Sequence, residues 1–235
     1  MKHLTLLFLL FSAVLTAQDT PEFFTKADNF LKTYVENGNV KYAEIKENPE
    51  DLKQLLNLAK RFETNPEEEE IFKAFWINAY NLGVIDGIVK NYPVKSPLEI
   101  EGFFDKQPHS LGLKSVTLDE IEHELVFGNF PQEERFHFAL VCAAKSCPQL
   151  ISEAYMPGIL EQQLQEQTLN TLNDPEFIRI NGNQVLLSEI FNWYKEDFTS
   201  KGQSFIQYVN QFRTNKISER KTVDFYEYNW ELNDL

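Results

Sequence analysis

Two segments near the N-terminus show the hydrophobic spacing of amphipathic helices. In residues 21–36 and 52–62, apolar side chains return at helical intervals, so that they line one face. The sequence Asn37-Gly38-Asn39 ends the first helix, because these residue types favour turns. Residues 40–45 then predict a short extended segment.

The longest helix is predicted from residue 66. Asn65 suits the N-cap, Pro66 suits the first helical position, and the glutamates at 67–70 place negative charge at the positive end of the helix dipole. Residues 71–89 are apolar on two faces at once, and a helix that is apolar nearly all round is a buried one. We therefore expect a long buried helix at the centre of the fold.

Two amides interrupt one apolar face of this helix, at Asn78 and Asn81. A buried amide without a hydrogen-bond partner costs about 1–3 kcal/mol. We therefore expect both side chains to bond to the backbone of a neighbouring segment, around residues 142–147.

A short helix follows a capping box formed by Thr117 and Glu120. On this helix His123 lies about 200° from the core-facing Ile121, so we expect a solvent-facing or capping histidine. The neighbouring acids at 122 and 124 are expected on the same solvated surface.

Short strands alternate with helices in the second half. Residues 137–141 form an apolar run that predicts a strand, and residues 177–180 and 184–187 flank the hairpin signal Asn181-Gly182. Ser188 and Ser204 are placed to begin two helices, and residues 222–228 predict a final strand. Since no regular βαβ period appears, we expect an α+β fold: a mostly helical single domain with a small, largely antiparallel sheet and a long buried central helix.

The N-terminus has the features of a secretory signal peptide. Lys2 precedes an apolar run at residues 4–15, and Ala17 offers a small residue for cleavage. The run is too short to span a bilayer, which takes about 20 residues. We expect residues 1–17 to be removed and residues 18–235 to be exported, to the periplasm or the exterior, without a membrane span.

Charge excludes one class of partner. The chain has a formal net charge of −14, which becomes −15 when Lys2 is removed. An acidic surface repels the phosphate backbone of nucleic acids, and no cluster of Lys and Arg offsets this repulsion. We expect no nucleic-acid binding and no cofactor; the partner would be an unidentified protein, peptide or cell-envelope ligand.

Five sequence blocks resemble one known family. They are FWINAYN (75–81), LDEIEHELV (118–126), RFHFALVCAAKSCP (135–148), LSEIFNWYKEDF (187–198) and YNWELND (228–234). Together and in this order they are similar to the uncharacterised family called domain of unknown function 547. The resemblance runs from about residue 40 to residue 235 and implies one compact domain with motif positions at His123, His137, Cys142 and Cys147. It implies no particular reaction.

The two cysteines allow a structural interpretation. Cys142 and Cys147 are the only cysteines of the chain, and in an exported protein they would close a small disulfide loop. Such a bridge would contribute about 2 kcal/mol of stability by restricting the unfolded chain.

The same residues allow a catalytic interpretation. A thiol nucleophile needs a base and a group that orients the base. Cys147, close to Lys145, would be the nucleophile and His123 the base, with Asn78 as the orienting amide and Asn81 and His137 as supporting residues. His137 and Cys142 face opposite sides of a regular strand, and Cys142 shares its face with apolar residues, so we expect it to be buried.

A metal site is a third arrangement of the same side chains. His123, His137, Cys142 and Cys147 would form a two-His, two-Cys set that zinc accepts, but their spacing matches no zinc module, so we expect no metal. Two functions therefore stay open. The favoured one is a non-catalytic binding module with a Cys142–Cys147 bridge and an aromatic-lined groove. The other is a thiol-dependent hydrolase or acyltransferase, of permuted papain-like type, acting on peptide or cell-envelope amides.

Overall fold

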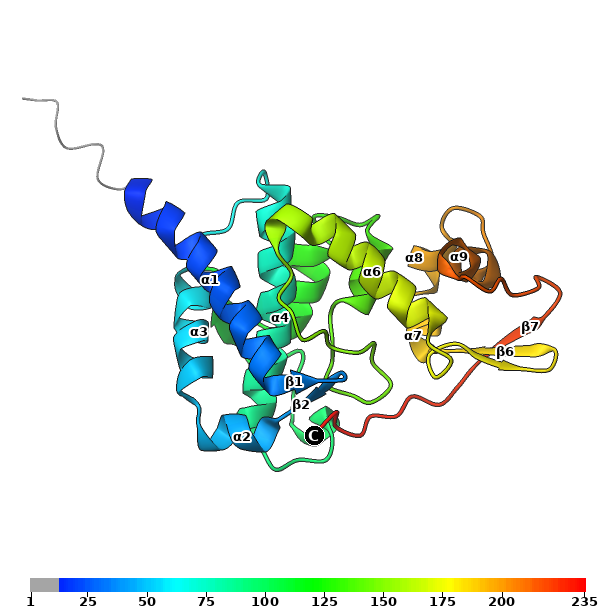
Figure 1. Ribbon diagram of the computed structural model, residues 1–235, viewed down its shortest axis with the longest axis horizontal. Helices are drawn as coiled ribbons and strands as arrows, with labels where there is room; N and C mark the ends of the chain where they lie inside the picture. Colours follow the sequence, from blue (N-terminus) through cyan, green and yellow to red (C-terminus); the bar gives the residue numbers. More distant parts are fainter. Residues whose placement is uncertain (1–12) are drawn as a thin grey trace, which may run out of the picture.

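A long central helix organises the structure, a computed structural model that describes residues 13–235 (Figure 1). This helix, α4 (Glu69–Asn91), is buried at every residue from Ala74 to Val89, which confirms the predicted central helix. It begins later than residue 66, because Asn65 closes a turn instead of capping the helix: its side chain accepts the N–H of Glu67 at 3.1 Å.

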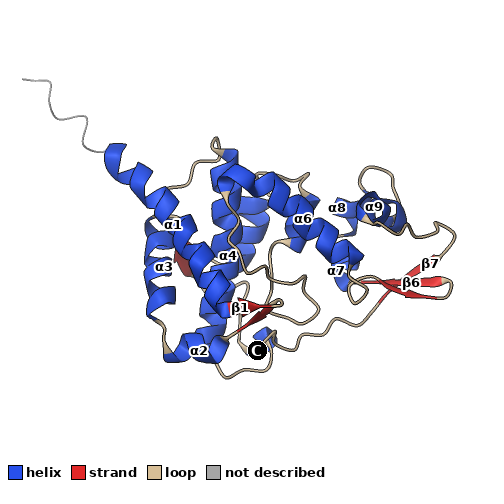
Figure 2. Ribbon diagram, in the orientation of Figure 1, coloured by secondary structure: helices blue, strands red, loops and turns tan. Residues whose placement is uncertain are grey.

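Helices dominate the fold, and the strands are short (Figure 2). The other α-helices are α1 (Ala13–Tyr34), α2 (Tyr42–Glu47), α3 (Glu50–Arg61), α5 (Leu118–Glu120), α6 (Leu160–Asn173), α7 (Glu189–Trp193), α8 (Lys195–Thr199) and α9 (Phe205–Phe212). A π-helical turn (Ile121–Val126) continues α5, and 3-10 turns lie at Pro97–Glu99, Glu134–Phe138 and Pro157–Ile159.

The strands form three small sheets. They are β1 (Val35–Glu36), β2 (Asn39–Val40), β3 (His109–Leu111), β4 (Lys114–Val116), β5 (Arg179–Asn181), β6 (Gln184–Leu187) and β7 (Thr222–Phe225). β1–β2, β3–β4 and β5–β6 pair antiparallel, whereas β6 and β7 pair parallel. The fold is therefore α+β and mostly helical, as expected, with its largely antiparallel strands divided among several sheets.

Several local predictions are confirmed. The capping box at Thr117 and Glu120 is present, as are the hairpin at Asn181-Gly182 and the helix caps at Ser188 and Ser204. The extended segment expected at residues 40–45 is wrong, because β2 ends at Val40 and α2 begins at Tyr42. The expected signal peptide lies outside the described residues over 1–12, and its remaining residues fall in α1.

Two hydrophobic clusters meet at one segment of the chain. The larger cluster surrounds α4 and includes Leu140 and Val141; the smaller one joins α7–α9 to the β5–β7 sheet and includes Phe138 and Ala144. Residues 138–144 therefore run along the boundary between them.

The strand expected at residues 137–141 is wrong, because its first residues belong to the 3-10 turn Glu134–Phe138 and side chains satisfy other backbone groups of the segment. Asn81 of α4 donates to the carbonyl of Ala139 and accepts the N–H of Val141, both at 2.9 Å. Gln167 of α6 donates to the carbonyl of Phe138 at 2.9 Å. Two buried amides thus replace the strand neighbour that a sheet would supply.

Within residues 13–235, no helix combines the length and the apolar character needed to cross a bilayer.

Candidate functional site

A pocket of about 280 Å³ lies where the two hydrophobic clusters meet. Its ionisable lining residues are Asp119, Glu122, His123 and His137. Its aromatic lining residues are Tyr80, Phe104, Trp193, Tyr194, Tyr228 and Trp230, and the lining is completed by Leu140, Cys142, Cys147 and Ile190. The volume is close to the lower limit for small-molecule sites, roughly 300–1,000 Å³.

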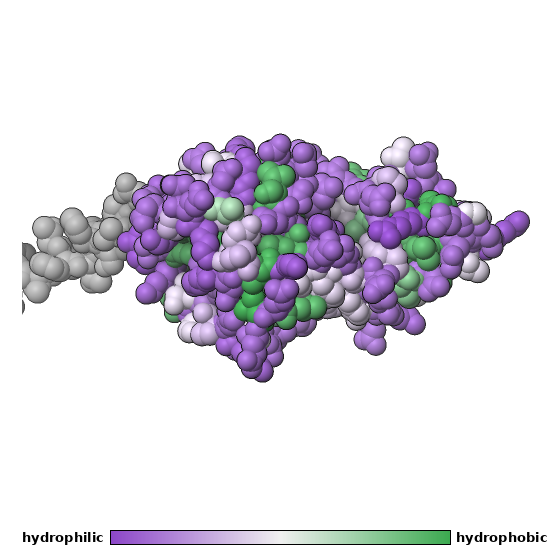
Figure 3. Space-filling view, turned by 90° about the horizontal axis from the view of Figure 1, so that it is seen from below, coloured by the Kyte–Doolittle hydropathy of each residue, from purple (hydrophilic) through white to green (hydrophobic). Residues whose placement is uncertain are grey.

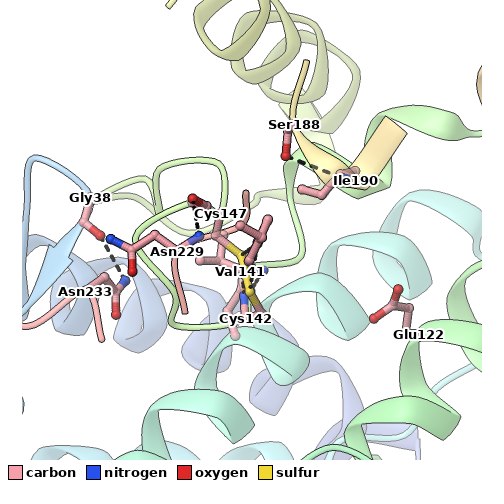
Figure 4. The surroundings of a disulfide bond; sticks show 12 residues. Gly38, Glu122, Val141, Cys142, Cys147, Ser188, Ile190, Asn229 and Asn233 are labelled. Atoms are coloured by element: carbon pink, nitrogen blue, oxygen red, sulfur yellow. Dashed lines mark hydrogen bonds between the residues drawn. A yellow bond between two sulfur atoms is a disulfide. The ribbon is translucent and has the colours of Figure 1, made fainter. Parts of the chain in front are cut away.

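The two cysteines form one wall of this pocket. Cys142 and Cys147 are bonded to each other, with their Cα atoms 6.3 Å apart, and both are half-buried (Figure 4). The expectation that Cys142 is buried is therefore wrong, because it sits in a turn and not on the apolar face of a strand. The N–H of Cys142 donates to the sulfur of Cys147 at 3.0 Å, and the hydroxyl of Tyr228 lies 3.2 Å from each sulfur.

The C-terminal segment holds the disulfide turn in place. The N–H groups of Lys145 and Ser146 donate to the carbonyls of Glu231 and Asn229 at 2.8 and 3.2 Å. The Lys145 side chain pairs with the carboxylate of Glu231 at 2.8 Å and lies outside the pocket lining. The turn therefore presents its sulfurs to the pocket and its backbone to the C-terminal segment.

Glu122 faces the disulfide across the pocket (Figure 4). It belongs to the π-helical turn, a conformation frequent at functional sites, and it is half-buried, so the expectation of a solvated face fails here. Tyr194 donates its hydroxyl to Glu122 at 2.8 Å. Burial and the nearby Glu122 carboxylate raise the pKa of Tyr194 and that of Tyr80. Both phenols therefore stay protonated, and Tyr194 donates to the carboxylate.

Aromatic rings from distant parts of the chain form a second wall, which adjoins the disulfide at Tyr228. Trp193 and Trp230 stack with their centroids 6.0 Å apart and an interplanar angle of 23°. The Tyr228 ring lies 4.8 Å from each of them, and Phe104 lies 6.4 Å from Trp230. Trp193 is 48% exposed, so part of this wall is open to solvent.

The two histidines occupy different environments at this site. His137 is buried between Phe127 and Tyr194, at 4.4 and 4.1 Å between ring centroids, and its Nε2 lies 2.7 Å from the carboxylate of Asp197. His123 is exposed, as expected, and its Nδ1 lies 3.1 Å from the carbonyl oxygen of Asp119. Each histidine is thus oriented by an aspartate residue.

The predicted amides lie beneath the pocket and do not line it. Asn78 and Asn81 are buried, as expected, and both bond to backbone. Asn81 bonds just before the disulfide turn, whereas Asn78 donates to the carbonyl of Tyr155 at 2.8 Å and accepts its N–H at 3.0 Å. The expected location around residues 142–147 is therefore wrong for Asn78, because the C-terminal segment satisfies the backbone of that turn.

Both cysteines and both histidines that the sequence predicted line this pocket. Most of the other lining residues were not predicted. Asp119 could have been found, because it lies four residues before His123 on the same helix. Glu122, Tyr194 and Asp197 carry no such local signal, because their partners are far away in the chain.

The structure shows no metal centre: among residues 13–235, no group of three or more His, Cys, Asp and Glu side chains is placed to hold a metal ion.

One family model matches part of the chain. Residues 64–172 match the model of the family described as "Protein of unknown function, DUF547". This range contains the blocks at 75–81, 118–126 and 135–148, while the blocks at 187–198 and 228–234 follow it. No curated protein and no solved structure matches the chain. This match includes both cysteines, His123 and His137, and shows that residues 64–172 are similar to the DUF547 family of proteins of unknown function.

Proposed function

We propose that this protein is a non-catalytic binding module whose pocket holds a small ligand, or the side chain of a larger one, against its aromatic wall. The Cys142–Cys147 bridge serves as a structural brace that keeps the adjoining wall, the 142–147 turn, rigid. A rigid pocket binds more tightly than a flexible one, because less conformational entropy is lost when the ligand enters.

The position of the sulfurs is the observation that carries this proposal. Both sulfurs are bonded to each other and contact the hydroxyl of Tyr228, whose ring belongs to the aromatic wall. The bridge thereby connects the 142–147 turn to the wall that would contact the ligand. Neither sulfur in this state is a nucleophile, because only a thiolate attacks.

The proposal is tested with three compounds of similar size and different charge: benzylammonium, benzyl alcohol and benzoate. Binding is measured by saturation-transfer NMR and by calorimetric titration of the oxidised protein. We expect saturable binding of at least one compound, and its loss in Trp193→Ala, because the alanine removes half of the stacked indole pair. Since Trp193 is 48% exposed, the variant should keep its fold.

Ile159→Ala is the matched control, because Ile159 is 49% exposed and lies outside the pocket lining. It should bind like the wild type. Absence of saturable binding for all three compounds would refute the binding module.

A thiol-dependent hydrolase or acyltransferase is the second candidate. It is favoured by one observation: Cys147, His123 and His137 line the same pocket. It requires reduction of the bridge, after which a histidine would deprotonate Cys147 for attack on an amide. The orienting group would be Asp119 or Asp197 and not Asn78, whose amide is occupied by backbone.

A thiol count separates the two candidates. In the binding module, the exported protein has no alkylatable thiol without reductant. Two free thiols, with Cys147 alkylated at an apparent pKa well below about 8.5, would favour the enzyme.

We also propose export after removal of residues 1–17. N-terminal sequencing of exported protein should begin near Gln18, and an intact Met1 would contradict it.

A further inference from the structure

We infer that the pocket selects an organic cation and binds its alkylammonium group between Glu122 and the aromatic wall. The inference rests on the proposed binding function and names the chemical class of the ligand.

The charges that line the pocket favour a cation. Its lining acids are Asp119 and Glu122, and none of the described residues that line it is Lys or Arg. The nearby Lys145 lies outside the lining and pairs with Glu231. The formal net charge of −14 adds an attractive field at longer range, and hydrophilic residues cover most of the face seen in Figure 3.

Glu122 is prepared to accept hydrogen bonds from such a ligand. A carboxylate offers about four acceptor positions, and the hydroxyl of Tyr194 accounts for one. This phenol fixes the carboxylate without neutralising it, because it is a neutral donor. The N–H groups of an ammonium ligand would donate to the remaining acceptor positions. An apolar ligand would instead remove solvent from this half-buried carboxylate and give no hydrogen bonds in return, which is unfavourable.

The aromatic wall supplies the second half of the recognition. A cation is attracted to the face of an aromatic ring within about 6 Å of its centroid, most strongly to tryptophan. The stacked pair of Trp193 and Trp230, with Tyr228 at 4.8 Å from each, supplies such rings in the same pocket as Glu122. An anion would be repelled by both the ring faces and the carboxylates.

Volume limits the size of the ligand. About 280 Å³ accommodates a compact group of several heavy atoms and excludes most drug-sized molecules. A wider hollow of about 570 Å³ lies beside α9, but its lining is mainly exposed polar side chains such as Gln207 and Gln211, so it offers no comparable site.

The test compares the affinities of the three compounds above in the oxidised wild-type protein. We expect benzylammonium to bind about tenfold more tightly than benzyl alcohol, with benzoate the weakest. If benzyl alcohol or benzoate binds as tightly as benzylammonium, the cation inference is overturned while the binding function stands. If no compound binds, the proposed function itself fails.

Glu122→Gln provides the matched variant. Glutamine can still accept the hydroxyl of Tyr194 but has no charge, so the preference for benzylammonium should fall severalfold. Glu124→Gln is its control, because Glu124 is an exposed acid of the same turn and lies outside the lining. An unchanged preference in Glu122→Gln would overturn the inference. If Glu122→Gln does not fold, the comparison of compounds in the wild type decides alone.

Two further probes identify the source of the ammonium group. Tighter binding of choline indicates a small free cation, and tighter binding of Nα-acetyl-lysine amide indicates a lysine side chain of a peptide. Either result supports recognition of an alkylammonium group. If neither binds while benzylammonium does, the aromatic ring of the probe carries the affinity and the inference is overturned.

Discussion

Asn81→Ala removes the side chain that holds the segment beneath the pocket. Asn81 is buried and bonds to two backbone groups, the carbonyl of Ala139 and the N–H of Val141, both at 2.9 Å. Both groups belong to buried residues that pair with no strand. The substitution therefore leaves the carbonyl of Ala139 and the N–H of Val141 without the Asn81 amide as a hydrogen-bond partner.

The magnitude follows from the two lost hydrogen bonds. A buried polar group that loses its partner costs about 1–3 kcal/mol, so the two together cost about 2–6 kcal/mol. Entry of a water molecule into the space left by the amide would recover part of this cost. We expect the free energy of unfolding to fall by about 2–4 kcal/mol, which lowers the urea midpoint by about 1 M for an m-value of about 3 kcal/mol/M.

Urea unfolding followed by circular dichroism measures this difference. Asn91→Ala is the matched control, because Asn91 lies on the same helix but is exposed and bonds only to the carbonyl of Gly87, at 2.8 Å. Its unfolding free energy should change by no more than about 0.5 kcal/mol. Equal midpoints for the two variants would refute the role given to Asn81.

Two further predictions concern stability. Burial lowers the pKa of His109 below its ordinary value of 6.5, so the unfolded state takes up this proton first and stability should fall as pH decreases through about 6.5. His109→Gln should flatten this part of the curve of unfolding free energy against pH, and an unchanged slope would contradict the assignment. Gly112 has φ +58° and a Cβ there would lie 2.7 Å from Trp76, whereas Gly182 has φ +53° and open space around it. Gly182→Ala should therefore lower the free energy of unfolding by about 1–2 kcal/mol, from backbone strain alone. Gly112→Ala should lower it by about 2–5 kcal/mol, because the clash with Trp76 adds to the same strain. Thermal or urea unfolding measures both changes, and equal values would count against the close approach of Trp76 to Gly112.

The elements that the sequence predicted are those stabilised by local interactions. The buried helix α4 follows from its own apolar pattern, and the caps at Thr117, Ser188 and Ser204 follow from residues within one turn of each helix start. The segment at residues 137–141 was mistaken for a strand, because its partners, Asn81 and Gln167, come from distant helices and carry no strand signal.

The residues of the pocket also divide into those with partners nearby in the sequence, which could be predicted, and those with distant partners, which could not. The cysteine pair could be predicted, because its two members are close in the sequence. The contact of Tyr194 with Glu122 and that of Tyr228 with the sulfurs join residues 72 or more positions apart, so no local pattern contains them. The pocket was therefore visible only in the folded chain.

A crystal structure of the oxidised protein with benzylammonium tests the central claim most directly. We expect the ammonium nitrogen within hydrogen-bond distance of Glu122 and beside the rings of Trp193 and Trp230, with the Cys142–Cys147 bridge intact. Benzylammonium bound elsewhere, with this pocket empty at saturating concentration, would contradict it.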